Sequence, residues 1–186
     1  MEPKNQYRNV AIEATSAIVM ESLFIRLALE SEVARRAAEL RDSALQEDLR
    51  VNLKQREAMG NDGDLQRTLD LGEAMHAAIC DAVGHPWMAR LLVASRAQLR
   101  GVWSFLLSIE GLPDQILQEH RLIVHAICAG EPEFAAAAMR AHLNGLSAVY
   151  AGHCEATGGT ALVRRRGSRR QCIHRLCQTN GAVGLG

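Results

Sequence analysis

The stretch from His120 to His142, HRLIVHAICAGEPEFAAAAMRAH, predicts the end of one helix, a tight break and most of a second helix. Gly130 suits the position just after a helix, because glycine adopts a positive φ without a Cβ clash. Pro132 suits the first turn of the next helix, where the missing N–H is not needed. Two helices joined by so short a break must form an antiparallel hairpin or cross steeply. This geometry predicts that the two terminal histidines of the stretch approach one another.

The composition favours helices over sheets. Aromatic residues make up only 4 % of the 186 residues, whereas Ala, Leu, Glu and Arg are abundant, and no stretch alternates with a period of two. The 21 basic and 21 acidic residues balance, which excludes a whole-chain field that recruits nucleic acid or membrane. No apolar run approaches the roughly 20 residues that span a bilayer, and the N-terminus lacks the apolar core of a secretory signal. Five cysteines, an odd number, favour reduced thiols and therefore a cytoplasmic protein.

Turn signals divide the chain into an all-α, single antiparallel bundle of about six helices. We expect helices over residues 16–40, 43–59, 65–83, 86–109, from Pro113 to Ala129, and 132–151, with Asp42 or Ser43 as the cap of the second. Residues 1–15 are interpreted as a leader or linker and residues 16–153 as the helical domain. Residues 154–186 are rich in Gly and Arg and are interpreted as a disordered tail.

Three histidines lie beside apolar residues in three different predicted helices: His76, His120 and His142. Neutral imidazoles that converge inside a bundle are good ligands for Zn²⁺ or a similar divalent ion. The alternative is that each is an ordinary hydrogen-bonded histidine of the core, and spacing alone favours that alternative.

Three segments carry a resemblance to a known family. They are MESLFIRLALESEVARRAAEL, LGEAMHAAICDAVGHPWMARLL and EHRLIVHAICAGEPEFAAAAMRAHL. In order and in the spacing around the histidines they resemble the FCD effector-binding domain of GntR-family (FadR-subfamily) transcription regulators. The resemblance covers roughly residues 18–153, and the last segment is its most specific part.

The resemblance implies a divalent metal at the floor of an effector pocket. In many such domains an Asp and three His hold this ion, and the three His correspond to His76, His120 and His142. The position of the Asp, four residues before the first His, is occupied here by Gly72, which has no side-chain oxygen. Glu73 projects to nearly the same face and is the expected substitute. Three His and a water still suffice for Zn²⁺, so zinc is the expected metal.

Arginines that face the same cavity would bind a carboxylate effector in a bidentate manner. By resemblance Arg26, which interrupts the apolar run LFIRLAL, is the first candidate. Arg96 and Arg100, four residues apart in the fourth predicted helix, come next. Arginine on a helix is more often a solvated residue or a salt-bridge partner, and that alternative stays open for all three.

The function expected from the resemblance is that of a ligand-sensing domain for a small organic acid, with or without the assistance of a metal. Such a domain forms a homodimer and is not an enzyme. Only about 15 residues precede the first predicted helix, too few for the winged helix-turn-helix of this family. We therefore expect no specific DNA binding by this chain alone, and no membrane partner.

Two alternatives of other classes remain. The first is a metal-dependent hydrolase in which the three His activate water and Glu73 or Glu119 acts as the base. The second is a degenerate, metal-free interaction domain. The arginine run RRRGSRRQCIHR in the tail is compatible with nucleic-acid binding, with a solvated tail or with an altered reading frame at the end of the gene.

Overall fold

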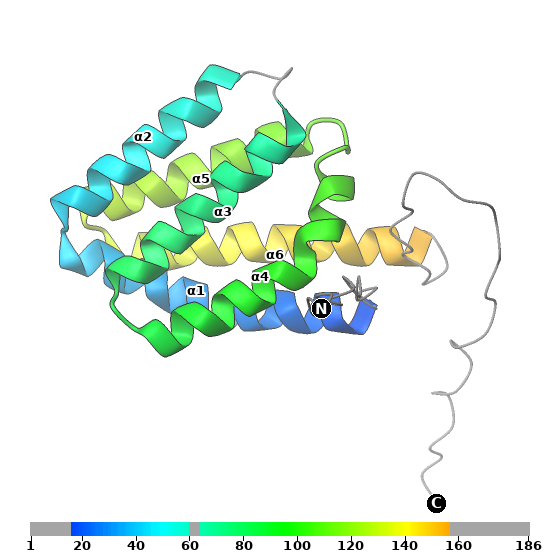
Figure 1. Ribbon diagram of the computed structural model, residues 1–186, viewed down its shortest axis with the longest axis horizontal. Coiled ribbons are helices and arrows are strands. Elements are labelled where there is room, and N and C mark those ends of the chain that lie inside the picture. Colours follow the sequence, from blue (N-terminus) through cyan, green and yellow to red (C-terminus); the bar gives the residue numbers. More distant parts are fainter. Residues whose placement is uncertain (1–15, 60–63, 157–186) are drawn as a thin grey trace, which may run out of the picture.

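The structure is a computed structural model that describes residues 16–59 and 64–156. Nearly all of these residues lie in helices (Figure 1). The helices are α1 (Ser16–Leu40), α2 (Ser43–Met59), α3 (Leu65–Ala82), α4 (Pro86–Leu106), α5 (Leu112–Ala129) and α6 (Pro132–Ala156). No strand occurs in these residues. The prediction of an all-α bundle of about six helices is confirmed.

The ends of the helices follow the local chemistry. Asp42 caps α2, because its Oδ1 accepts a hydrogen bond of 2.8 Å from the backbone N–H of Ala44. The fourth helix ends at Leu106 rather than near residue 109, and α6 continues to Ala156. Residues 154–156 are therefore helical and do not belong to the tail. The predicted leader (1–15) and the rest of the predicted tail (157–186), with its arginine run, lie outside the described residues.

The break between α5 and α6 has the predicted conformation. Gly130 has a φ of 68°, and its N–H points to the carbonyl oxygens of Ala126 and Ile127. The N–H of Glu131 donates to the carbonyl of Ala126 at 3.0 Å, which closes the end of the helix in the Schellman manner. Pro132 then begins α6. The two helices pack against one another as a hairpin.

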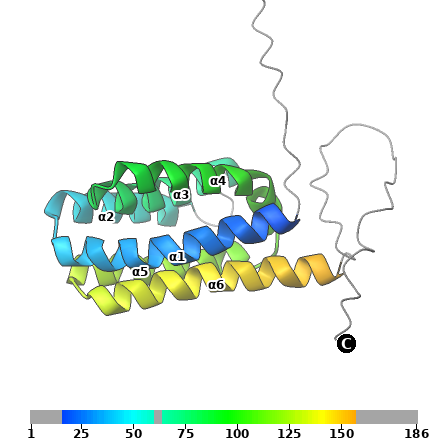
Figure 2. The same cartoon turned by 90° about the horizontal axis from the view of Figure 1, so that it is seen from below.

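The longest two helices form the spine of the bundle. Helices α1 and α6 run side by side in opposite directions (Figures 1 and 2). Where α1 begins and α6 ends, Cys154 Sγ lies 3.7 Å from Ser16 Oγ. Helix α5 packs on α6, α1 and α2, while α3 and α4 pack on α1 and on each other. Fully buried apolar side chains from all six helices fill the interior, among them Val19, Leu49, Ile79, Leu92, Ile123 and Leu143.

Helix α1 departs from a purely apolar inner stripe. Leu23, Val33 and Ala37 are buried on the inner face of this helix. Between them, however, Arg26 and Glu30 are also buried, with 3 % and 1 % of their surfaces exposed. Charged side chains in such a position need partners inside the protein, so the centre of the bundle must contain a polar site. Among the described residues, no helix is both long and apolar enough to cross a membrane.

Two glycines give a matched test of the break. Replacing Gly130 with Ala places a side chain in the left-handed region and brings the new Cβ within 2.7 Å of Cζ of Arg41. We expect Gly130→Ala to lower the free energy of unfolding by roughly 1–2 kcal/mol, measured by urea unfolding.

The control is Gly152→Ala, within α6, where a Cβ meets nothing within 4 Å. This variant should be more stable by roughly 0.5–1 kcal/mol, because alanine loses less backbone freedom than glycine in a helix. Equal effects of the two substitutions would show that the conformation of Gly130 does not matter.

Candidate metal and effector site

Three histidines from three helices meet in the centre of the bundle. His76 of α3, His120 of α5 and His142 of α6 are each at most 5 % exposed. One nitrogen from each ring can be chosen so that all three lie within 4.8 Å of one another. The ring centroids of His120 and His142 are 4.7 Å apart, and the other two pairs are 5.3 and 5.4 Å apart. The hairpin of α5 and α6 therefore brings its two histidines together as the sequence predicts.

The outer nitrogens of these rings face charged groups. His142 Nδ1 lies 2.7 Å from Oε2 of Glu119 and donates to it. His76 Nδ1 lies 2.5 Å from Oε2 of Glu30, although this contact lacks hydrogen-bond geometry. His120 Nδ1 contacts Nη1 of Arg56, and its Nε2 lies 3.3 Å from Nε2 of His142. His142 is thus oriented by a carboxylate that accepts its outer N–H, as metal-binding histidines usually are, whereas the outer nitrogen of His120 faces a hydrogen-bond donor.

Burial keeps the three imidazoles neutral near pH 7. It lowers the pKa of His76 to about 4, although Glu30 acts in the opposite direction. Burial also lowers the pKa of His120 well below its ordinary value, assisted by the neighbouring His142 and His76. The pKa of His142 is lowered too, mainly by burial. Neutral imidazoles keep the lone pairs that a metal ion needs.

A buried ion pair stands next to the histidines. Arg26 Nε donates to Oε1 of Glu30 at 2.9 Å, within one face of α1. Burial acts to raise the pKa of Glu30, but Arg26 and His76 outweigh it and hold the pKa well below its ordinary value. The guanidinium of Arg26 also lies over the ring of Trp103, with Cζ 5.8 Å from the ring centroid.

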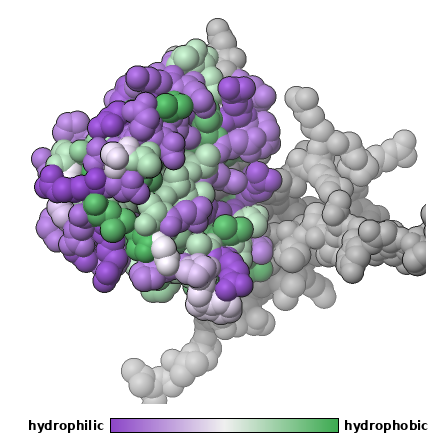
Figure 3. Space-filling view, turned by 60° about the vertical axis from the view of Figure 1, so that its left-hand side comes forward, coloured by the Kyte–Doolittle hydropathy of each residue, from purple (hydrophilic) through white to green (hydrophobic). Residues whose placement is uncertain are grey.

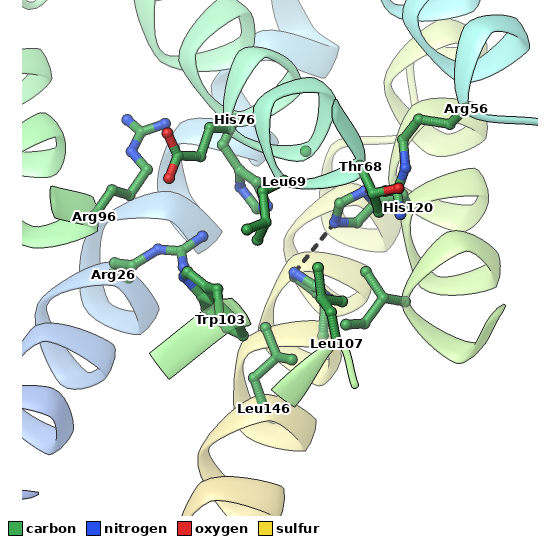
Figure 4. Close-up of a pocket in the computed structure, with 14 residues that line it drawn as sticks. Arg26, Arg56, Thr68, Leu69, His76, Arg96, Trp103, Leu107, His120 and Leu146 are labelled. Atoms are coloured by element: carbon green, nitrogen blue, oxygen red, sulfur yellow. Dashed lines mark hydrogen bonds between the residues drawn. The ribbon is translucent and has the colours of Figure 1, made fainter. Parts of the chain in front are cut away.

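A small cavity opens beside the cluster (Figure 4). Its volume is about 50 Å³, and it is bounded by apolar side chains such as Leu69, Leu107, Ile116 and Leu146 together with the three histidines. Three guanidiniums, those of Arg26, Arg56 and Arg96, and one carboxylate, that of Glu73, also line it. Figure 4 shows Arg26 and Arg96 on one side of the histidines and Arg56 on the other.

Two of these guanidiniums are buried without a carboxylate partner among the described residues. Arg96 is 6 % exposed; its Nε donates to the carbonyl of Leu92 at 3.2 Å, and its Nη1 has no hydrogen-bond partner. Arg56 is 7 % exposed and contacts His120. Buried cations without a compensating charge are costly in free energy.

Comparison with known proteins agrees with this arrangement. Residues 21–145 match the FCD domain family. This chain is an FCD domain. It is also 32 % identical over 144 residues to the HTH-type transcriptional regulator LutR of Bacillus subtilis (strain 168), a match that covers 74 % of this chain. The aligned region makes up 64 % of LutR, so the chain spans less than two thirds of that relative. The resemblance to the effector-binding domain of GntR-family transcription regulators is confirmed.

The FCD domain places two of the predicted site residues differently. The side chain of Arg100 is 59 % exposed and lies outside the cavity lining, where it pairs with Asp70 at 3.3 Å and with Glu73 at 3.4 Å. Glu73 lines the cavity but does not belong to the histidine group, because its carboxylate is directed to Arg100. Glu73, the expected substitute for the missing aspartate, thus pairs with Arg100 and is not grouped with the three histidines. Arg26 and Arg96 do reach the cavity.

Two further residues of the FCD site were not predicted as binding residues. Arg56 lies in the charged stretch NLKQREAM, which has the pattern of a solvated helix face, and no signal in that stretch marks it. Glu119 was considered only as a hydrolytic base. In the sequence Glu119 directly precedes His120, which predicts that both residues lie on the same helix. It does not predict that the side chain of Glu119 contacts His142.

The donor set of this FCD domain fits a metal ion. Three neutral, buried imidazoles on rigid helices match the nitrogen ligands that Zn²⁺ prefers, with room for a fourth ligand from solvent or effector. Gly72 also leaves space, since a Cβ there would lie at an ordinary contact distance of 3.5 Å from Cε1 of His120. A carboxylate at this position would point toward the cluster.

The lowered histidine pKa values predict a pH-dependent stability. His76 has an ordinary pKa of 6.5, which falls to about 4 in the folded protein. Between these values the unfolded chain binds more protons, so the free energy of unfolding falls as the pH falls. Each unit of pKa difference corresponds to about 1.4 kcal/mol. Urea unfolding of the metal-free protein over this pH range should show the loss, with full stability above pH 6.5.

Two variants test whether His76 causes this loss of stability. His76→Gln should make the free energy of unfolding depend less on pH. His125→Gln, at an exposed position of α5, should leave the pH dependence as in the parent protein. An unchanged slope in His76→Gln would contradict the assignment.

Proposed function

We propose that this FCD domain binds a small organic acid in the central cavity and so acts as the ligand-sensing part of a transcription regulator. The observation that carries the proposal is the pair of buried guanidiniums, Arg56 and Arg96, that lack a carboxylate partner among the described residues. An anionic ligand would supply the missing charge and accept a hydrogen bond from Nη1 of Arg96. The small volume of the cavity favours a small acid over an extended ligand.

We further propose that His76, His120 and His142 hold a divalent metal ion, with Zn²⁺ the best match to three nitrogen ligands. When bound, such an ion supplies a Lewis-acidic position that attracts a carboxylate oxygen. Glu119 and Glu30 would orient His142 and His76 and keep their rings as neutral ligands.

Binding is a better account of these residues than hydrolysis. Glu119, one of the two candidate bases, has one carboxylate oxygen on His142 Nδ1 and the other 2.8 Å from Nε2 of Gln115. Glu73, the other candidate, is paired with Arg100. Both carboxylates are held by other side chains, and these contacts favour binding over hydrolysis. Since the named relative is a transcription regulator, we also propose that the chain works in the cytoplasm.

We propose in addition that the domain forms a homodimer through α1 and α4. Large apolar side chains are exposed on both of these helices, which pack against each other. Phe24 and Met20 on α1 are 68 % and 41 % exposed, and Trp87 and Val93 on α4 are 76 % and 60 % exposed. Figure 3 shows hydrophobic side chains at the surface of one face of the molecule. Surfaces of this kind usually mark a protein interface.

Thermal unfolding with a panel of small mono- and dicarboxylic acids tests the ligand proposal. An acid at about a hundred times its Kd should raise the Tm by roughly 5–10 °C. Arg96→Leu should lose this increase, because it removes the buried anchor. Arg90→Leu is the control, since Arg90 lies on the same helix but is exposed, with its guanidinium over Trp87. An equal increase in the Arg96→Leu protein would contradict the assignment.

Sedimentation of a Phe24→Asp variant tests the dimer. A charge at this exposed position of α1 should convert a dimer to a monomer without loss of helix content. Leu122→Asp, at a position of α5 that is 51 % exposed, is the control and should remain dimeric. A monomeric parent protein would refute the proposal.

A further inference from the structure

Arg56 is the residue of the site whose position is least expected. It projects from α2 into the cavity and contacts Nδ1 of His120, 64 positions away in the chain. No carboxylate lies within ion-pair distance of it among the described residues, and burial lowers its pKa to about 10. The guanidinium of Arg56 therefore contacts a ring nitrogen of His120, although His120 is otherwise buried beside two other histidines as a metal ligand would be.

The contact defines where the proton of His120 lies. A guanidinium has five N–H donors and no acceptor, so Arg56 donates and His120 Nδ1 accepts. A neutral His120 must then carry its proton on Nε2. That proton faces Nε2 of His142 at 3.3 Å, and His142 is able to accept it because its own Nδ1 donates to Glu119. The inner nitrogens of both rings are thus occupied by a single shared proton.

A metal ion is incompatible with this arrangement at either nitrogen of His120. A metal on Nε2 requires the proton to move to Nδ1, where it would face the N–H donors of Arg56. A metal on Nδ1 requires the place that Arg56 itself occupies. In both cases a divalent ion would also stand beside a buried guanidinium, and the two cations repel each other in a site of low dielectric constant.

Gly72 explains why the two cations cannot be held together. It lies beside His120, where a Cβ would be 3.5 Å from Cε1, yet it contributes no anionic group. A carboxylate at this position could neutralise both a metal ion and Arg56. Without one, a metal ion and Arg56 would both stand at His120 with no anion at position 72 to offset their repulsion.

We propose that Arg56 competes with the divalent metal for His120, so that it serves as an internal cation in the metal-free state and leaves His120 when a metal binds. This inference rests on the proposed three-histidine metal site. It assigns to Arg56 the role of a residue that sets the metal affinity of the domain.

The test measures the Zn²⁺ affinity of the full chain by competition with a chromophoric chelator, after the resident metal has been removed. Arg56→Leu should bind Zn²⁺ about 10- to 100-fold more tightly than the parent, because metal binding no longer has to break the charged hydrogen bond between Arg56 and His120. Arg50→Leu is the control: Arg50 is exposed on the same helix, and its removal should leave the affinity unchanged. An unchanged or weaker affinity in Arg56→Leu would overturn the proposal.

A second measurement uses the parent protein and does not depend on the folding of a variant. Nitrogen-15 NMR of the histidine rings, assigned with His120→Gln, should show His120 protonated on Nε2 without metal. Addition of Zn²⁺ should move this proton to Nδ1 or replace the hydrogen bond from Arg56 to Nδ1 with a bond from Nδ1 to the metal. A metal-free His120 protonated on Nδ1 would overturn the proposal.

The outcomes also separate this inference from the proposed function. Gly72→Asp should bind Zn²⁺ more tightly with Arg56 still present, since a carboxylate accommodates both cations. If neither Gly72→Asp nor Arg56→Leu binds Zn²⁺, the competition is refuted together with the metal site. Stabilisation of the parent protein by small carboxylic acids would still support the sensing function.

Discussion

The polar interior of this bundle depends on the carboxylate of Glu30. It is 1 % exposed, and it faces both Nε of Arg26 at 2.9 Å and Nδ1 of His76 at 2.5 Å. Removing one partner of a buried ion pair typically costs about 3–5 kcal/mol, because the other charge is left without compensation. Glu30 therefore holds one wall of the cavity and one of the three imidazoles in place. The neighbouring helices can pack around charged groups only because this pairing exists.

The remaining charges of the site do not balance. Arg26 is compensated by Glu30, whereas Arg56 and Arg96 have no carboxylate within ion-pair distance among the described residues. The histidines are kept neutral by burial and so add no charge of their own. A cavity with surplus buried positive charge has a lower free energy with an anion inside it. This surplus of positive charge is the physical basis of the proposed sensing function, in which an anion from outside would supply the missing charge.

Helix architecture explains why the histidine cluster can respond to several parts of the protein at once. Its three rings come from α3, α5 and α6, and their outer nitrogens contact α1, α2 and the preceding turn of α5. A change in what occupies the centre therefore reaches three helices, α1, α2 and α3, besides the two that form the hairpin. Helix α1, which carries Glu30, also carries the exposed apolar side chains of the proposed dimer interface.

The sequence by itself determined the helices, the break at Gly130 and the meeting of His120 with His142. These features depend on residues close together in the chain: a glycine with positive φ, a proline in the first turn, and apolar spacing of about 3.6 residues. Together with the family resemblance it also pointed to Arg26, which interrupts an apolar run, and to Arg96. Only the tertiary structure decided that Arg100 and Glu73 pair with each other at the rim and that Arg56 enters the centre. The local sequence pattern does not distinguish a solvated arginine from a buried one, because burial depends on the helix that packs against it. For Arg56 the contacted residue of that helix, His120, lies 64 positions further along the chain.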